Sequence, residues 1–159
     1  MGRLDNKVTL VTGAGAGIGR AIALAAAAEG AIVVVTDLDE AAARRVAAEC
    51  GPDASAYAVD VADKAAVDAT VAAVRAAHGR IDVLVNNAGW DQAMPFVQTE
   101  PEFWAKVIGI NFLGVLHTCR AVLPIMAAQG HGRVVNLGSD AGRVGSSGEA
   151  VYSGAKGAV

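Results

Sequence analysis

The chain has 159 residues, 53% of them hydrophobic and 18% charged, and its net charge is −3. This length and composition exclude a disordered chain and allow one domain, residues 1–159, with a sizeable core. The absence of a basic cluster argues against nucleic acid, and no stretch reaches the roughly 18–20 consecutive apolar residues of a membrane span.

The cysteines and histidines give no sign of a disulfide framework or a metal site. Cys50 and Cys119 are isolated in the sequence, and His78, His117 and His131 lack the spacing of metal ligands. The N-terminus leads into a strand without the layout of a signal peptide. We therefore expect a cytoplasmic protein with reduced thiols and no metal.

The N-terminal segment predicts a strand, a glycine-rich loop and a helix. The β-branched run at 7–12 is typical of a strand, and Gly13, Gly17 and Gly19 follow it and open a helix. Glycines in this context let a pyrophosphate approach the backbone, while the helix N-terminus offers unpaired N–H groups. The spacing predicts a dinucleotide-binding loop that includes Ile18; a tight turn without a ligand is the alternative.

A second strand is predicted at 31–36, followed by Asp37 and by a helix over 40–50. A carboxylate at the tip of this strand, about 20 residues beyond the glycines, can accept both hydroxyls of an adenosine ribose and would repel a 2′-phosphate. Leu38 follows, and no basic residue lies at 14–16, so NAD is favoured over NADP. A simple helix-capping role for Asp37 is the alternative.

The next two strands end in residues that suit close contact with a cofactor. Strands are predicted at 55–59 and 81–85, with a helix at 64–78 between them. The residues after these strands are acidic, amide-bearing or small: Asp60 and Val61, then Asn86, Asn87, Ala88 and Gly89. Such residues let a cofactor pass close to the backbone.

A long helix is predicted at 100–129, with Asn111 in its middle, where Asn is a mediocre helix former. A buried amide that closes a gap in the backbone hydrogen bonding is the alternative to a functional role for Asn111. The fifth strand is predicted at 132–137 and leads into Ser139.

Tyr152 and Lys156 are four residues apart and share one face of a predicted helix, roughly 5–6 Å apart at Cβ. Free tyrosine titrates near pH ~10, so lowering its pKa to about 7 needs roughly 4 kcal/mol of preference for the phenolate. A nearby ammonium can supply that preference. Ser139 could hydrogen-bond the oxygen that gains or loses the proton. An ordinary amphipathic helix pair explains the same spacing.

Strands that alternate with helices predict an α/β protein with a doubly wound, Rossmann-like parallel sheet. Ligands of such sheets bind beyond the carboxyl ends of the strands, near the switch point between the first and fourth strands. The candidate residues fall at these ends, which favours function over the structural alternatives.

These motifs resemble the short-chain dehydrogenase/reductase family along the whole chain. The matching features are the glycine-rich loop after Thr12, Asp60-Val61, Asn86–Gly89, Asn111, Ser139 and the Tyr152/Lys156 pair. The resemblance implies hydride transfer between NAD and a secondary alcohol or ketone, with Tyr152 as general acid/base. It implies that Lys156 binds the nicotinamide ribose and lowers the pKa of Tyr152. Ser139 is implied to orient the substrate oxygen, and Asn111 to hold a water that relays protons through Lys156.

Two segments, one at Trp90-Asp91 and one around Arg143, are similar to members of the family that act on a cyclic hydroxyacyl-CoA. Trp90 is expected to floor an apolar ring pocket. Arg143 is expected to attract an acyl-CoA phosphate or a carboxylate, or only to brace its loop. Dehydrogenases or reductases of 3-hydroxyacyl and 3-oxoacyl thioesters, and sugar-type dehydrogenases, are the alternatives.

Family members usually continue for two further strands, so we expect a C-terminally truncated fragment of an enzyme that forms homo-oligomers. Non-catalytic NAD binding by the fragment is the competing function. The end at Val159 is expected to leave apolar sheet surface bare, and the turn at 152–156 held by few contacts.

Overall fold

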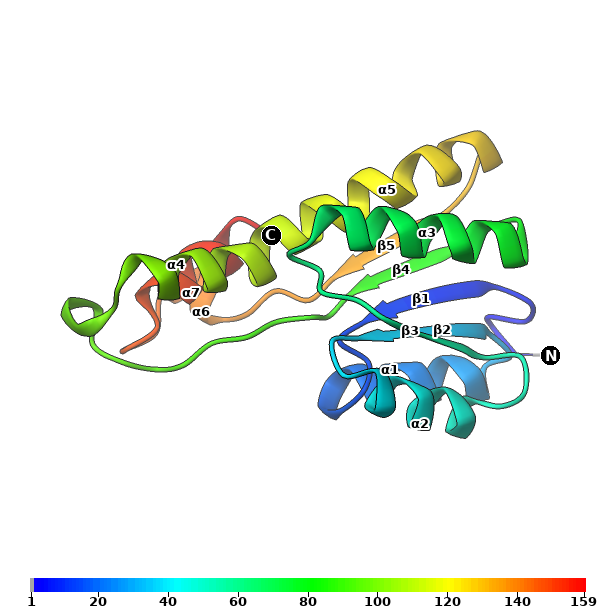
Figure 1. Ribbon diagram of the computed structural model, residues 1–159, viewed down its shortest axis with the longest axis horizontal. Coiled ribbons are helices and arrows are strands. Elements are labelled where there is room, and N and C mark those ends of the chain that lie inside the picture. The colour runs from blue at the N-terminus through cyan, green and yellow to red at the C-terminus, as the bar shows by residue number, and fades with distance from the viewer. Residues whose placement is uncertain (1) are drawn as a thin grey trace.

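A computed structural model describes residues 2–159 and contains a five-stranded parallel sheet (Figure 1). The strand order is β3-β2-β1-β4-β5, so the chain turns from one half of the sheet to the other between β3 and β4. The predicted doubly wound α/β fold is confirmed. The strand bounds are Val8–Thr12 for β1, Ile32–Asp37 for β2, Ser55–Ala58 for β3, Val83–Asn86 for β4 and Arg133–Asn136 for β5.

Parallel pairing places the carboxyl ends of all five strands on the same side of the sheet. Thr12 pairs with Thr36 across β1 and β2, and Asn86 pairs with Asn136 across β4 and β5. Asp37 lies one residue further along β2. The loops that follow these strands therefore meet beyond the carboxyl ends of the strands, although they are far apart in the sequence.

The sheet is covered by helices on both faces (Figure 1). Leu10 and Leu84 belong to one core and Val11 and Val85, one position later, belong to the other. Burial on both faces explains why β1 is buried along its whole length. The covering helices are α1 (Gly17–Ala28) and α2 (Glu40–Cys50) on one face, and α3 (Lys64–His78) and α5 (Gly114–Gln129) on the other.

The segment predicted as one helix at 100–129 changes its pitch in the middle. α4 (Pro101–Ile108) passes into a π turn, Gly109–Leu113, which passes into α5. Asn111 lies in this turn and is fully buried. Turns of this kind occur frequently at functional sites.

Within residues 2–159, the segment 101–129 is also long and apolar enough to cross a membrane by length and composition, with a mean hydropathy of 1.4. Val122, Ile125 and Met126 on α5 pack into the core beside α3 and β4. Burial against the sheet therefore accounts for the apolar residues on this face of α5.

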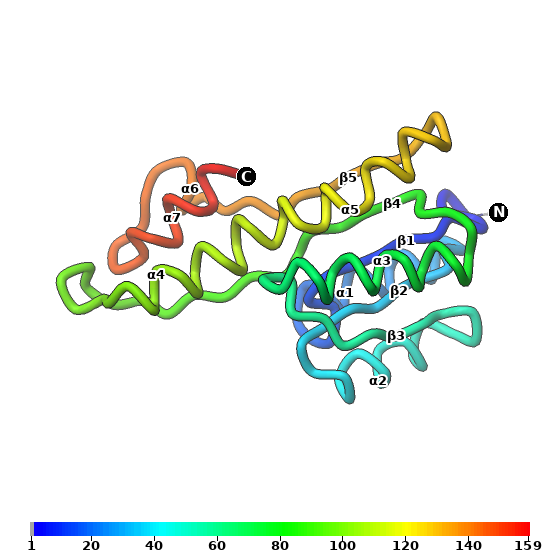
Figure 2. The backbone as a smooth tube through the Cα atoms, turned by 45° about the horizontal axis from the view of Figure 1, so that its top comes forward, coloured from blue at the N-terminus to red at the C-terminus, as the bar shows by residue number. Residues whose placement is uncertain are grey.

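Two short helices, α6 (Ala141–Val144) and α7 (Ala150–Gly157), form a lobe with α4 beyond the strand ends (Figure 2). α6 and α7 approach closely, since a Cβ on Gly142 would lie 2.6 Å from the Gly157 nitrogen. Ala155 and Lys156 on α7 are buried. The expectation that few contacts hold the turn at 152–156 is therefore wrong, because α7 packs on both α6 and α4.

The edge strand β5 is the least covered strand. Val135 is 48% exposed, and its neighbours Arg133 and Asn136 are exposed as well. Val135 is thus an exposed apolar residue of this strand, and the expected larger bare apolar surface stays a prediction.

Candidate active site

The glycine-rich loop between β1 and α1 is shaped for close contact with phosphate groups. Gly13 has a φ of +61°, and a Cβ on Gly19 would lie 2.2 Å from the carbonyl oxygen of Gly13. Within residues 2–159, no side chain caps α1, whose N-cap residue is Ala16. The first N–H groups of this helix can therefore bind an anion.

Asp37 holds the glycine-rich loop instead of capping a helix. Its Oδ2 accepts a hydrogen bond from the Gly15 N–H at 2.8 Å, and its Oδ1 accepts one from the Asp39 N–H at 3.0 Å. Asp39 is the N-cap residue of α2, and its side chain accepts from the Ala42 N–H. The capping alternative for Asp37 is therefore excluded. A Cβ on Gly15 would lie 2.9 Å from the Asp37 carboxylate, so this close approach requires glycine.

A cleft of about 600 Å³ lies beyond the carboxyl ends of β1, β2 and β4. Its lining includes predicted cofactor residues from the loops after these three strands and after β3. These are Gly13, Ile18, Gly19, Asp37, Leu38, Asp60, Val61, Asn87, Ala88 and Gly89. The structure thus brings together residues from four loops at the place where a doubly wound sheet binds nucleotides.

Three of the predicted cofactor residues do not line the cleft, and four residues that were not predicted do. Gly17 is outside the lining of the cleft, and Tyr152 and Lys156 line a neighbouring pocket. The sequence analysis missed four lining residues: Ala16, Val59, Lys106 and Ile110. Lys106 and Ile110 are four residues apart, so both lie on the face of the helix that lines the cleft. This spacing could have identified them in the sequence.

Thr12 and Asn87 join the glycine-rich loop to the loop after β4. The Thr12 hydroxyl accepts hydrogen bonds from the N–H groups of Asn87 and Ala88, both at 3.1 Å. The Asn87 side chain donates to the carbonyl oxygens of Thr12 and Gly13, both at 2.9 Å. These bonds fix the wall of the cleft without a ligand.

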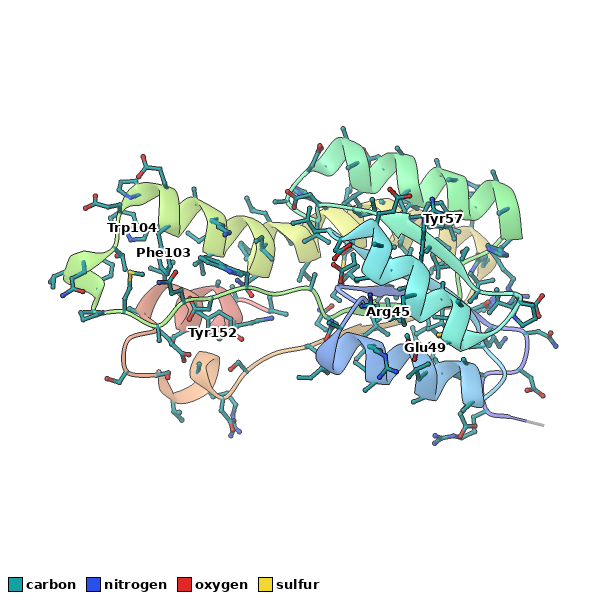
Figure 3. The ribbon with its side chains drawn as sticks, turned by 60° about the horizontal axis from the view of Figure 1, so that its bottom comes forward. Arg45, Glu49, Tyr57, Phe103, Trp104 and Tyr152 are labelled. Atoms are coloured by element: carbon teal, nitrogen blue, oxygen red, sulfur yellow. The ribbon has the colours of Figure 1, made fainter. Side chains whose placement is uncertain are left out.

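A second pocket of about 400 Å³ adjoins the cleft and holds the predicted catalytic groups. Ser139, Tyr152 and Lys156 line it, and Figure 3 shows Tyr152 on α7 in the lobe beyond the strand ends. The pocket and the cleft share part of their lining: Ile18, Asn87, Gly89 and Trp90. A ligand in the cleft can therefore reach one in the pocket.

Lys156 carries an ammonium group in a buried position. The residue is 7% exposed, and burial lowers the pKa of its side chain. The Nζ atom donates to the Leu137 carbonyl oxygen at 2.9 Å and lies 5.9 Å from the ring centroid of Tyr152. Ser139 approaches from the end of β5, where its hydroxyl accepts from the Ala141 N–H at 3.2 Å.

Asn111 ties the π turn to the loop after β4. Its Nδ2 donates to the carbonyl oxygens of Val107 at 2.9 Å and of Trp90 at 2.6 Å, and its Oδ1 accepts from the Trp90 N–H at 3.3 Å. A Cβ on Gly89 would lie 2.9 Å from Asn111 Oδ1 and 3.7 Å from Lys156 Nζ. Asn111 and Lys156 are therefore close neighbours around Gly89, while the Asn111 amide is engaged by the backbone.

Trp90 and Arg143, two of the three expected substrate residues, are placed very differently. Trp90 lines both cavities, and its ring meets Phe103 edge-on with centroids 5.7 Å apart and lies 3.6 Å from Lys106 Nζ. Arg143 lies on α6 outside the pocket, where its exposed side chain pairs with Asp140 at 3.2 Å. The structure brings Trp90 to the catalytic groups and leaves Arg143 at the surface.

Among residues 2–159, no group of three or more His, Cys, Asp or Glu side chains is placed to hold a metal ion. The site combines a glycine-rich loop at a helix N-terminus, an acidic strand end and a helix with a half-buried Tyr152 and a buried Lys156. The first two features are typical of dinucleotide-binding proteins built on a doubly wound sheet.

Comparison with known proteins identifies the family within that class. The family model described as short chain dehydrogenase matches residues 7–159, so the chain belongs to this family. A sorbitol dehydrogenase of Cereibacter sphaeroides is 44% identical over 99% of this chain and 62% of its own length. A 3-oxoacyl-[acyl-carrier-protein] reductase of Escherichia coli is 36% identical over 96% of this chain and 62% of its own length.

A solved structure has the same fold. The crystal structure of NAD+-bound xylitol dehydrogenase superposes with a TM-score of 0.94 at 39% sequence identity, covering 98% of this chain and 62% of that one. The chain thus spans 62% of the length of the relatives named here.

Proposed function

We propose that the whole protein containing this chain is an NAD-dependent dehydrogenase that interconverts a secondary alcohol and a ketone. The observation that carries the proposal is the buried Lys156 ammonium beside Tyr152, in a pocket that adjoins a nucleotide-sized cleft. A buried cation next to a phenol is what base catalysis at neutral pH requires.

The cleft fits NAD. The uncapped start of α1 and the glycine-rich loop suit the pyrophosphate, and the Asp37 carboxylate suits the adenosine ribose. Lys156 would exchange its bond to Leu137 for the nicotinamide ribose. When bound, NAD supplies the hydride acceptor or donor.

The remaining chemistry is a proton transfer by the chain itself. In the direction of oxidation, the Tyr152 phenolate would take the proton of the substrate hydroxyl, and the hydrogen on the adjacent carbon would leave with its bonding electron pair as a hydride, for which bound NAD would be the acceptor. Lys156 stabilises the phenolate by its charge, and Ser139 donates to the substrate oxygen. Asn111 is proposed to hold a water that relays protons through Lys156; support comes from the proximity of both side chains to Gly89.

For the substrate we propose a polyol. Support comes from the sorbitol and xylitol dehydrogenases, whose identities of 44% and 39% exceed the 36% of the 3-oxoacyl thioester reductase. A pocket of about 400 Å³ with charged and hydroxyl side chains suits a small polar molecule.

A second candidate is the cyclic hydroxyacyl-CoA, as in 2-hydroxycyclohexanecarboxyl-CoA dehydrogenase, which the Trp90 and Arg143 segments resemble. The Trp90 ring against Phe103 favours it as a wall for an apolar ring. The surface position of Arg143 and its pairing with Asp140 weigh against it.

A substrate panel separates the candidates. The whole protein is offered polyols, cyclic 2-hydroxyacyl-CoA thioesters, 3-hydroxyacyl thioesters and simple secondary alcohols, with NAD reduction as readout. We expect the highest kcat/KM for a polyol; a clear preference for a thioester would select the second candidate. NAD binding without turnover on any substrate would make the protein a binding protein. We further infer a homo-oligomer in the cytoplasm.

A further inference from the structure

Asp91 is a half-buried acidic residue that the proposed proton transfer does not use. It lies in the loop after β4 and lines the same pocket as Ser139 and Tyr152. Its place in the loop is held by the residue before it, because the Trp90 N–H and carbonyl oxygen are both bonded to Asn111. The backbone position of Asp91 beside the reaction site is therefore well defined.

The Asp91 carboxylate has no donor of its own. Both of its oxygens are buried, and within residues 2–159 neither accepts a hydrogen bond. Buried polar groups are almost always paired, and a buried carboxylate without donors is unfavourable. A ligand that brings hydroxyl groups to this wall of the pocket, with a small rotation of the side chain, would satisfy it.

The charges around Asp91 do not neutralise it. Within residues 2–159 no ion pair involves Asp91, and the ammonium of Lys156, which lines the same pocket, donates to Leu137. Glu149 lines the same pocket, and its side chain does not cap α7. Two acidic residues therefore lie at this wall, and a rotation of the Asp91 side chain would turn its oxygens toward the pocket.

We propose that Asp91 determines the substrate class: it accepts hydrogen bonds from hydroxyl groups next to the reacting carbon and repels substrates that are negatively charged there. The proposal rests on the proposed dehydrogenase function and deepens it. A neutral polyhydroxy compound satisfies the carboxylate. An alkyl chain leaves the buried acceptor unpaired, and a hydroxy acid adds a like charge, so both are disfavoured.

The test compares Asp91→Asn with wild type in the whole protein, on three substrates of equal chain length: a polyol, a 2-alkanol and a 3-hydroxy acid. We expect kcat/KM for the polyol to fall at least about tenfold, since hydrogen bonds to a charged acceptor are lost. We expect kcat/KM for the 2-alkanol to change less than about twofold and that for the hydroxy acid to rise. Asp140→Asn, at the surface beside Arg143, is the matched control and should leave all three unchanged.

The outcomes separate this inference from the proposed function. Equal losses on all three substrates, or a weaker Kd for NADH, would give Asp91 a merely structural role and overturn the inference. Polyol oxidation that Asp91→Asn leaves unchanged would overturn it as well, with the proposed function intact. A wild-type enzyme that prefers the hydroxy acid or a thioester would overturn the inference and the polyol proposal, with the dehydrogenase function intact.

Discussion

Lys156 shows how one residue can serve two parts of the site. Burial lowers the pKa of its ammonium group, yet the group keeps a hydrogen bond to Leu137 and lies beside Tyr152. In the proposed mechanism the same charge holds the ribose and stabilises the phenolate. Substitutions of Tyr152 and of Lys156 should therefore affect NADH binding and kcat differently.

Tyr152→Phe removes only the proton carrier. We expect NADH to bind the whole protein as before and kcat to fall by about 10²–10⁴-fold, the usual contribution of general acid–base catalysis. Lys156→Ala should weaken NADH binding and lower kcat together. Tyr57→Phe, on β3 and far from Tyr152 (Figure 3), is the control for loss of a phenol hydroxyl. A Tyr152→Phe enzyme with a sizeable fraction of the wild-type rate would contradict the assignment.

Asp37 is expected to select NAD. Asp37→Ala removes a negative charge that opposes a 2′-phosphate and the acceptor that holds Gly15. NAD affinity should fall about tenfold while NADP affinity rises, so the difference between kcat/KM with NAD and kcat/KM with NADP should become smaller. Glu40→Gln, a nearby carboxylate that pairs with Arg44, should leave the ratio unchanged. Equal use of both cofactors by the wild-type protein would refute the cofactor proposal.

At the scale of elements, a buried carboxylate joins the amino ends of three strands, on the side of the sheet away from the site. Asp82 is 3% exposed, accepts from the Val8 N–H at 2.9 Å, and pairs with Arg80 and, at 3.0 Å, with His131. Burial opposes its ionisation, but the hydrogen bonds from Arg80, Val8 and His131 and the charge of Arg80 outweigh burial and hold the pKa of Asp82 below its ordinary value. Asp82 therefore links the starts of β1, β4 and β5.

This link predicts a pH-dependent stability. Because the pKa of Asp82 is lower in the folded state, its stabilisation is complete above the unfolded value of about 3.9 and is lost as the pH falls through the folded value. Asp82→Asn should lower the free energy of unfolding at pH 7 by about 2 kcal/mol and flatten its acid dependence. Asp68→Asn, which breaks an exposed pair with Lys64, should cost less than about 0.5 kcal/mol. If Asp82→Asn and Asp68→Asn gave equal denaturation curves across this pH range, Asp82 would not stabilise the fold in this way.

On the scale of the whole molecule, the two faces of the sheet are unequally covered at β5. Val135 is 48% exposed there, and Leu116 and Leu123 on α5 are each 48% exposed. Exposed apolar surface of this kind favours association. β5 and α5 both lead into the lobe that carries Tyr152 and Lys156 (Figure 2).

We predict that the 159-residue polypeptide, expressed alone, self-associates, binds NADH weakly and shows negligible turnover. Sedimentation velocity and NADH fluorescence titration test these expectations. Val135→Thr should reduce association by making the exposed face of β5 more polar. A soluble monomer with dehydrogenase rates within the usual range of about 1–10³ per second would show that this inference is wrong.

Some elements follow from local residues and were predictable for that reason. The helices predicted at 40–50 and 64–78 have those bounds in the structure, because Asp39 and Asp63 cap their first turns and Gly79 takes a left-handed conformation after the second. The glycine-rich loop and the acidic end of β2 were recognisable for the same reason. Caps, turns and strand ends depend on neighbours in the chain, and a single sequence contains those neighbours.

Other features depend on residues that only the fold brings together. The π turn at Asn111 forms where an amide binds the backbone of Trp90, and Asp82 meets Val8 and His131 across three strands. The sequence by itself determined the five strands, the helices beside them, the glycine-rich loop and the Tyr/Lys spacing, but not the π turn or α6. Only the tertiary structure decided that Arg143 faces solvent and that Asp91 lines the pocket without a donor, because loop paths and strand order set such distances.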